Sequence, residues 1–230
     1  MTLCGGPRDS ISNLCTKMGR EDWYRNREWT PEIEAAFRTR LERSRYHRPS
    51  NLRIQALYLI NTRERRLVEV GLSLAEEFIN RYPDHSDIQG GFALRAEALI
   101  LLGREEGVVA AFRESLRRQR PNVLTDVAFD YFLYVAKRKL RDLYAEAGEL
   151  AAARARQSFD LPSHVFKFCC ATALVNDDLG VKEMASKFAR SALDAFNAKH
   201  SGMSKHPKMG LVHSVDANMY LDIERIARLS

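Results

Sequence analysis

The sequence predicts an all-α protein, an α-α superhelix in which antiparallel helix hairpins stack as a solenoid. Apolar residues recur at spacings of three and four in successive segments, and glycine or proline separates these segments. No segment of appreciable length alternates apolar and polar residues with a period of two, which argues against strands. A composition of 45% hydrophobic and 29% charged residues is that of a chain that folds.

The first predicted helix spans residues 30–48 and caps the array. Thr30 is a suitable N-cap, and Pro31 suits the first helical position because it has no N–H to satisfy. One face of this helix is apolar at i, i+4 and i+8, formed by Ile33, Phe37 and Leu41.

Four hairpins and a last helix follow, delimited by turn residues. The third hairpin is expected as a long helix over residues 125–147, a break at Gly148 and a short second helix, and Ser163 is the expected cap of the fourth hairpin. The hairpins are predicted at residues 52–83, 88–120, 125–158 and 163–200, and the C-terminal helix at 214–229.

Residues 1–17 are predicted to lie outside the single domain of residues 18–230, as a disordered tail or an extension upstream of a true start at Met18. They contain no apolar region typical of a secretory signal, so a cytoplasmic location is expected. Cys169 and Cys170 fall in an apolar helical run and are expected to be buried and reduced. No apolar run is long enough to span a bilayer.

The second hairpin has the strongest internal pattern. Large residues fill the space between its two helices, a small one lets them cross closely, and a glycine forms the turn; these are Phe92, Ala96, Leu99, Gly103, Val108 and Phe112. Corresponding glycine and alanine positions follow in the third and fourth hairpins, at Gly148, Ala153, Gly180 and Ala185. Residues 52–200 therefore resemble tetratricopeptide repeats, and the stretch DWYRNREWTPEIEAAF is similar to uncharacterised bacterial members of that family.

The resemblance implies a protein-binding module whose concave surface is lined by the first helix of each pair. In the third hairpin, Tyr131, Tyr134, Arg138 and Arg141 fall opposite the expected core face. Aromatic rings supply contact area and guanidinium groups bind carboxylates, so these four residues are the predicted partner-binding site. The alternative is that both tyrosines pack against the next hairpin while the arginines are solvated.

Two other groups of side chains have open interpretations. The aromatic residues that precede the first helix either cap the array or stack on nucleic-acid bases; they are Trp23, Tyr24 and Trp29, interleaved with Arg25 and Arg27. The histidines of a lysine-rich loop either bind a metal or are solvated; they are His200, His206 and His213.

The chain carries no phosphate-binding loop, nucleophile elbow, H-E-x-x-H motif or EF-hand loop. We therefore expect a non-catalytic module without metal or cofactor. A net charge of +6 favours an acidic protein or peptide as partner. A dedicated regulatory or immunity-type partner of one protein is the alternative, a nucleic-acid-binding repeat ranks below both, and a homodimer stays open.

Overall fold

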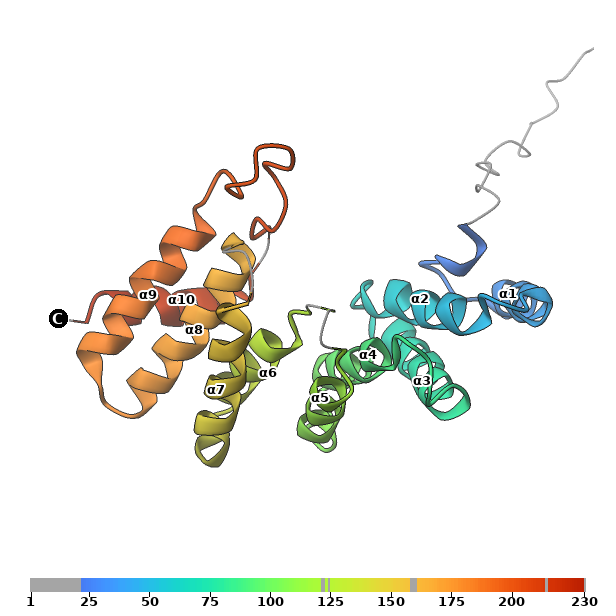
Figure 1. Ribbon diagram of the computed structural model, residues 1–230, viewed down its shortest axis with the longest axis horizontal. Helices are drawn as coiled ribbons and strands as arrows, with labels where there is room; N and C mark the ends of the chain where they lie inside the picture. The colour runs from blue at the N-terminus through green and yellow to red at the C-terminus, as the bar shows by residue number, and fades with distance from the viewer. Residues whose placement is uncertain (1–21, 121–122, 124, 158–160, 214, 230) are drawn as a thin grey trace, which may run out of the picture. The chain divides into compact units, whose positions relative to one another are not determined.

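The computed structural model describes residues 22–120, 123, 125–157, 161–213 and 215–229, and throughout these ranges the chain is helical without a strand (Figure 1). The all-α prediction is confirmed. The chain divides after Ala111 into two compact units. The tail expected at residues 1–17 lies outside the described residues.

Helix α1 (Pro31–Arg43) begins as predicted. The Thr30 hydroxyl accepts a hydrogen bond from the Ile33 backbone N–H at 3.3 Å, and Pro31 occupies the first turn. The helix ends before residue 48 because Arg48 folds back over it. The Arg48 guanidinium donates to the carbonyl oxygens of Leu41 (3.0 Å) and Glu42 (2.5 Å), and the Leu41 carbonyl also accepts from the Ser44 N–H at 3.1 Å.

Helices α2 (Arg48–Ile60), α3 (Arg65–Arg81) and α4 (Ile88–Leu101) pack in sequence in the first unit. Glycine permits the close approach at each crossing. A Cβ at Gly71 on α3 would lie 2.7 Å from the Ile60 side chain, and one at Gly91 on α4 would lie 2.6 Å from the Phe78 ring. These two positions are therefore closed to larger residues by contacts between neighbouring helices.

Gly103 ends α4 with a φ of +70°, in the turn that leads to α5 (Val108–Arg117). This is the predicted turn of the second hairpin. The apolar residues predicted to fill this hairpin are all buried: Phe92, Ala96, Leu99, Val108 and Phe112. The boundary between the two units falls within α5, after Ala111.

The third hairpin differs from the prediction. Helix α6 (Val127–Lys137) is short, and the chain reverses at Lys139, whose φ is +52°. A 3-10 turn (η2, Arg141–Leu143) then leads into α7 (Tyr144–Ala155), so Gly148 lies inside α7 against the Phe132 ring and not at a break. The prediction of one helix over residues 125–147 is wrong. The turn after α6 has a left-handed residue, as many helix ends do, but this residue is Lys139 and not the glycine that usually indicates such a turn.

Helices α8 (Pro162–Asp178) and α9 (Lys182–Phe196) form the fourth hairpin, with the predicted turn at Gly180 (φ +77°). Ser163 does not cap α8; Pro162 opens the helix, and the Ser163 N–H donates to the Gly210 carbonyl at 2.7 Å. Helix α10 (Ala217–Ala227) packs on both α8 and α9, capped by the Asp216 carboxylate.

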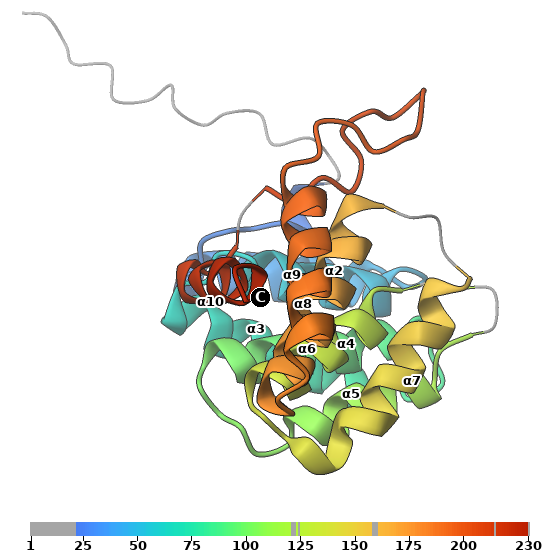
Figure 2. The ribbon, with the colours of Figure 1, turned by 90° about the vertical axis from the view of Figure 1, so that its left-hand side faces the viewer.

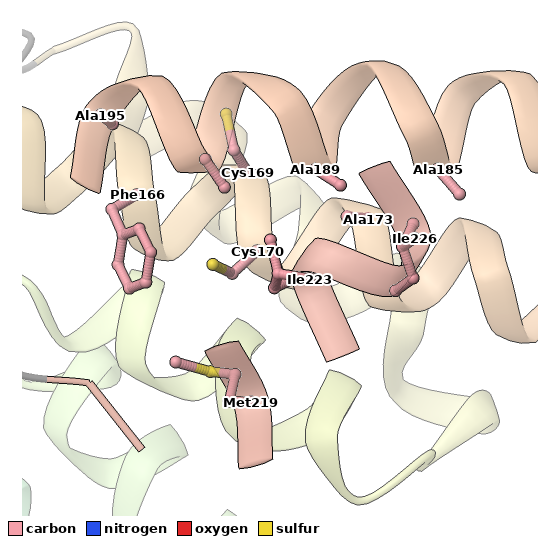
Figure 3. Close-up of a cluster of buried hydrophobic side chains, with 11 residues drawn as sticks. Phe166, Cys169, Cys170, Ala173, Ala185, Ala189, Ala195, Met219, Ile223 and Ile226 are labelled. Atoms are coloured by element: carbon pink, nitrogen blue, oxygen red, sulfur yellow. The ribbon is translucent and has the colours of Figure 1, made fainter. Parts of the chain in front are cut away.

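The core of the second unit lies among α8, α9 and α10 (Figure 3). Ala185 and Ala189 on α9 belong to this core together with Met219, Ile223 and Ile226 of α10, and the close-up shows Ile223 next to Cys170 of α8. The C-terminal helix thus covers the fourth hairpin within its own chain. Part of the loop that follows α9 projects beyond the helices (Figure 2), whereas Gly210 is hydrogen-bonded to Ser163 and Val212 and Val215 pack against the core.

Candidate binding site

The predicted face on α6 is not exposed. Tyr131 has 0% and Tyr134 8% of its surface accessible, so neither can present its ring to a partner. Both rings pack on Phe112, with centroids 5.4 Å and 5.9 Å away. Phe112 belongs to the preceding, second hairpin, whereas the alternative interpretation placed both tyrosines against the next one.

The two arginines of that predicted face lie at the turn that follows α6. Arg138 is the C-cap of the helix. Arg141 binds the Asp178 carboxylate through Nε at 2.7 Å and Nη2 at 3.1 Å, and the Tyr144 hydroxyl donates to the same carboxylate at 3.0 Å. Arg141 therefore joins η2 to the end of α8.

Tyr131 and Tyr134 are buried because α6 is enclosed on several sides. It packs against α7 and α8, and Phe112 of α5 covers its remaining face. A signal for this was present, since VAFDYFLYVAK has only Asp130 and Lys137 as charged residues and is apolar around the whole helix. Such a helix is typical of a central position, not of a two-faced surface.

An open groove of about 1010 Å³ lies in the first unit, at the N-terminal end of α2. The segment that precedes α1 contributes two aromatic rings to it, Trp23 and Tyr24. The end of α1 contributes Arg40, Arg43 and Ser44, and the start of α2 contributes His47, Ser50, Asn51 and Ile54. We call this site the basic-aromatic groove.

The aromatic wall of the groove belongs to a strap, residues 22–29, that begins with a 3-10 turn (η1, Asp22–Tyr24). Gln55, fully buried in α2, holds this strap. Its Oε1 accepts from the Asn26 backbone N–H (3.0 Å) and from Asn26 Nδ2 (2.9 Å), and its Nε2 donates to the Asn26 carbonyl (2.8 Å). Asn26 Nδ2 also donates to the Trp23 carbonyl at 2.8 Å.

Ring contacts complete the attachment of the strap. Trp23 and Trp29 pack on Phe37 of α1 with centroids 5.6 Å and 5.4 Å away, and Trp23 meets Tyr24 edge to face. The Trp29 carbonyl accepts from Arg66 of α3 at 3.1 Å. The aromatic residues therefore cover the α1–α2 pair, and Trp23 and Tyr24 also line the groove.

The groove carries positive charge that the surrounding structure does not neutralise. Arg38, one helical turn from the groove, is bound to Glu77 at 2.6 Å. In the described part of the chain, by contrast, Arg40 and Arg43 form no salt bridge, and neither does exposed Arg45. The positive end of the α2 dipole adds to the charge of these arginines. The N-cap residue of α2, His47, forms no side-chain hydrogen bond to the free N–H groups at this helix end.

This charge is local. Residues 22–111 contain 14 arginines, no lysine and 14 aspartates and glutamates, so their formal charge is zero. The excess falls instead in residues 112–230, where 19 lysines and arginines face 14 acidic residues. The two groove arginines are therefore a local positive charge on a unit whose formal charge is zero.

A second, smaller pocket of about 450 Å³ lies along the same helix pair. Ile33 of α1 and Tyr58 of α2 line it together with strap residues Asp22, Arg25, Asn26, Arg27 and Glu28. The guanidinium of Arg27 lies over the Tyr58 ring at 5.9 Å, and Arg25 lies over Tyr24 at 5.3 Å while it pairs with Asp22 at 3.4 Å. We call this site the Tyr58 pocket.

The remaining candidates do not form a site. Over the described ranges, no group of three His, Cys, Asp or Glu side chains is arranged to hold a metal ion, and His200, His206 and His213 lie exposed on their loop. Cys169 and Cys170 are buried and free, as predicted. None of the helices within these ranges combines the length and apolar character needed to cross a bilayer.

Sequence similarity contributes no assignment. No protein-family model matches the chain, and no curated protein or solved structure matches it.

Proposed function

We propose that this chain is a non-catalytic interaction module of the tetratricopeptide-like kind that binds an acidic peptide segment of a protein partner in the basic-aromatic groove. The single observation that carries the proposal is the combination of two unpaired arginines and two aromatic rings around one groove. Guanidinium groups bind carboxylates through paired hydrogen bonds, and Trp and Tyr supply contact area at a low cost in side-chain entropy.

The size and lining of the groove favour a peptide over a small metabolite. About 1010 Å³ is at the upper end of the range typical of small-molecule pockets. Its hydroxyl groups, from Ser44 and Ser50, suit the N–H and C=O groups of an extended backbone, whereas Asn51 is buried and its Nδ2 donates to Ser44 Oγ at 3.2 Å. Tyr46, in the α1–α2 turn between groove residues Ser44 and His47, is 90% exposed and available to a ligand at the rim.

Single-stranded nucleic acid is the second candidate, because Trp23 and Tyr24 beside Arg40 and Arg43 also suit base stacking and phosphate contacts. The neutral charge of residues 22–111 argues against it, since binding a strand relies on many phosphate contacts. The chain could instead be a dedicated regulatory or immunity-type partner, which would use the same groove. It would then bind one cognate protein, whereas a general interaction module binds several.

Selection of random dodecapeptides displayed on phage, against the full chain at about 0.15 M salt, tests the proposal. Wild type should enrich Asp and Glu, and Arg40→Glu/Arg43→Glu should abolish that enrichment, while Arg45→Glu keeps it. Arg45 is the matched control because it is exposed, unpaired within the described residues and outside the groove. Equal selection by wild type and the groove variant contradicts the proposal, as does tighter binding of a dT20 oligonucleotide than of the selected peptides.

A further inference from the structure

The basic-aromatic groove and the Tyr58 pocket lie along one face of α2. The α2 residues that line them are Asn51 and Ile54 in the groove and Tyr58 in the pocket, spaced by three and four positions. Such spacing places side chains on the same side of a helix. Helix α1 runs antiparallel beside them, since Arg40 and Arg43 reach the groove and Ile33 reaches the pocket.

Both sites therefore lie along the α1–α2 pair, with the strap between them, and we call the surface that carries the two sites the trough. The strap passes over α2 at Asn26. Gln55, which lies between Ile54 and Tyr58 on α2, holds Asn26 there by hydrogen bonds. Tyr58 follows Asn51 by seven positions, which corresponds to about 10 Å along a helix axis. An extended peptide covers that distance with about three residues.

The charges of the two sites differ. Arg40 and Arg43 make the groove cationic, whereas the strap residues of the Tyr58 pocket balance two arginines against Asp22 and Glu28. A balanced rim does not select a ligand charge. Ile33 and the Tyr58 ring form the apolar part of the pocket, with the Arg27 guanidinium 5.9 Å from the centre of that ring. Apolar surface inside a polar rim is the arrangement that holds an apolar anchor residue in protein interfaces.

We infer that the trough recognises a bipartite segment of a partner protein, in which acidic residues occupy the basic-aromatic groove and a large apolar residue three or four positions away occupies the Tyr58 pocket. This inference rests on the proposed function of the groove and adds to it the second subsite, the class of residue that fills it and the spacing. The ligand backbone passes over the outer surface of the strap between the two sites.

Fluorescence anisotropy with two labelled dodecapeptides tests the inference. The first carries three successive glutamates followed by phenylalanine at the third position after them, and the second has serine in place of that phenylalanine. For wild type, the phenylalanine peptide should bind at least fivefold more tightly. In Ile33→Gln, which makes the apolar part of the pocket polar, this preference should fall below twofold while affinity for the serine peptide stays unchanged.

The control variant is Ala36→Gln, which places the same side chain on an exposed position of α1 outside the pocket. It should behave as wild type, and circular dichroism checks that each variant is folded. Equal affinity of wild type for the two peptides, with both lost in Arg40→Glu/Arg43→Glu, overturns the second subsite and leaves the acidic groove standing. If neither peptide binds wild type, the acidic groove fails as well.

Discussion

Asn26 and Gln55 are joined by three hydrogen bonds of 2.8 to 3.0 Å, in which the Gln55 amide serves the backbone N–H, the carbonyl and the side chain of Asn26. A side-chain amide pairs with a peptide group much as a neighbouring strand would. Because Gln55 is fully buried, this pairing fixes the strap, and through it Trp23 and Tyr24, on the α1–α2 pair.

Replacing Gln55 by alanine should destabilise the chain by about 2–3 kcal/mol, since it leaves the Asn26 groups without partners and opens a void. It should also weaken binding of acidic peptides by loosening the aromatic wall. Urea unfolding followed by tryptophan fluorescence measures the first effect. Gln157→Ala, at the exposed end of α7, is the control and should change stability by less than about 0.5 kcal/mol.

Lys139 is a site where substitution by glycine should stabilise the protein. Its φ of +52° lies in the left-handed region, which costs a non-glycine residue about 1 kcal/mol. Its ammonium group is 3.8 Å from Asp178 and well exposed, so little is lost with the side chain. Lys139→Gly should therefore raise the urea midpoint, whereas Lys137→Gly, within the last turn of α6, should lower it. Two changes of the same sign would contradict this account of the turn.

Acid should weaken the link between α5 and α7. Arg113 donates to both Glu146 oxygens, at 2.8 Å and 2.5 Å, and the Tyr131 hydroxyl adds a bond at 3.1 Å. The Arg113 guanidinium, first, and the Tyr131 hydroxyl hold the pKa of Glu146 below its usual 4.5. As the pH falls, Glu146 is therefore protonated in the unfolded chain before it is protonated in the folded protein. The stabilisation from its bonds to Arg113 and Tyr131 is complete above about pH 5 and is lost as the pH falls through the folded pKa of Glu146.

Glu146→Gln should thus lower stability by about 1 kcal/mol at pH 7 and make the loss of stability below about pH 5 shallower. Glu149→Gln, on the same helix but exposed and without a salt bridge in the described residues, should leave the pH profile unchanged. Thermal unfolding across this pH range measures both. Parallel profiles for wild type and Glu146→Gln would contradict the assignment.

Cys169 and Cys170 should resist alkylation in the folded protein. Burial raises the pKa of Cys169 to about 11, and burial followed by the neighbouring thiol raises that of Cys170 as well, so the reactive thiolates are scarce at pH 8. Iodoacetamide labelling read by peptide mass spectrometry should modify both only in about 6 M guanidinium. Rapid labelling without denaturant would show that the core among α8, α9 and α10 opens.

Local signals predicted much of the fold. Thr30 with Pro31, and the glycines at 103 and 180, mark their helix ends by chemistry confined to a few neighbouring residues, and all three occur as expected. The α6–α7 turn escaped prediction because its left-handed residue is Lys139, which has no turn preference. Helix-wheel geometry alone also placed Tyr131 on a surface, although Phe112 of α5 covers it.

The groove was only partly predictable. Trp23 and Tyr24 were noted as a possible cap or stacking group, and both line the groove beside Arg40 and Arg43. No sequence pattern indicates which arginines of α1 are paired. The distinction depends on Glu77, which lies far along the chain and neutralises Arg38 but not its neighbours.

The chain's two tryptophans allow the central claim to be measured directly. Trp23 lines the groove and Trp29 is buried, so Trp29→Phe leaves Trp23 as the reporter. Titration with the triglutamate-phenylalanine peptide should shift Trp23 emission saturably, with at least tenfold weaker binding after Arg40→Glu/Arg43→Glu and no response to a peptide with lysines in place of glutamates. An equal response to both peptides, or to the acidic peptide in both proteins, would contradict an acidic-segment site in the groove.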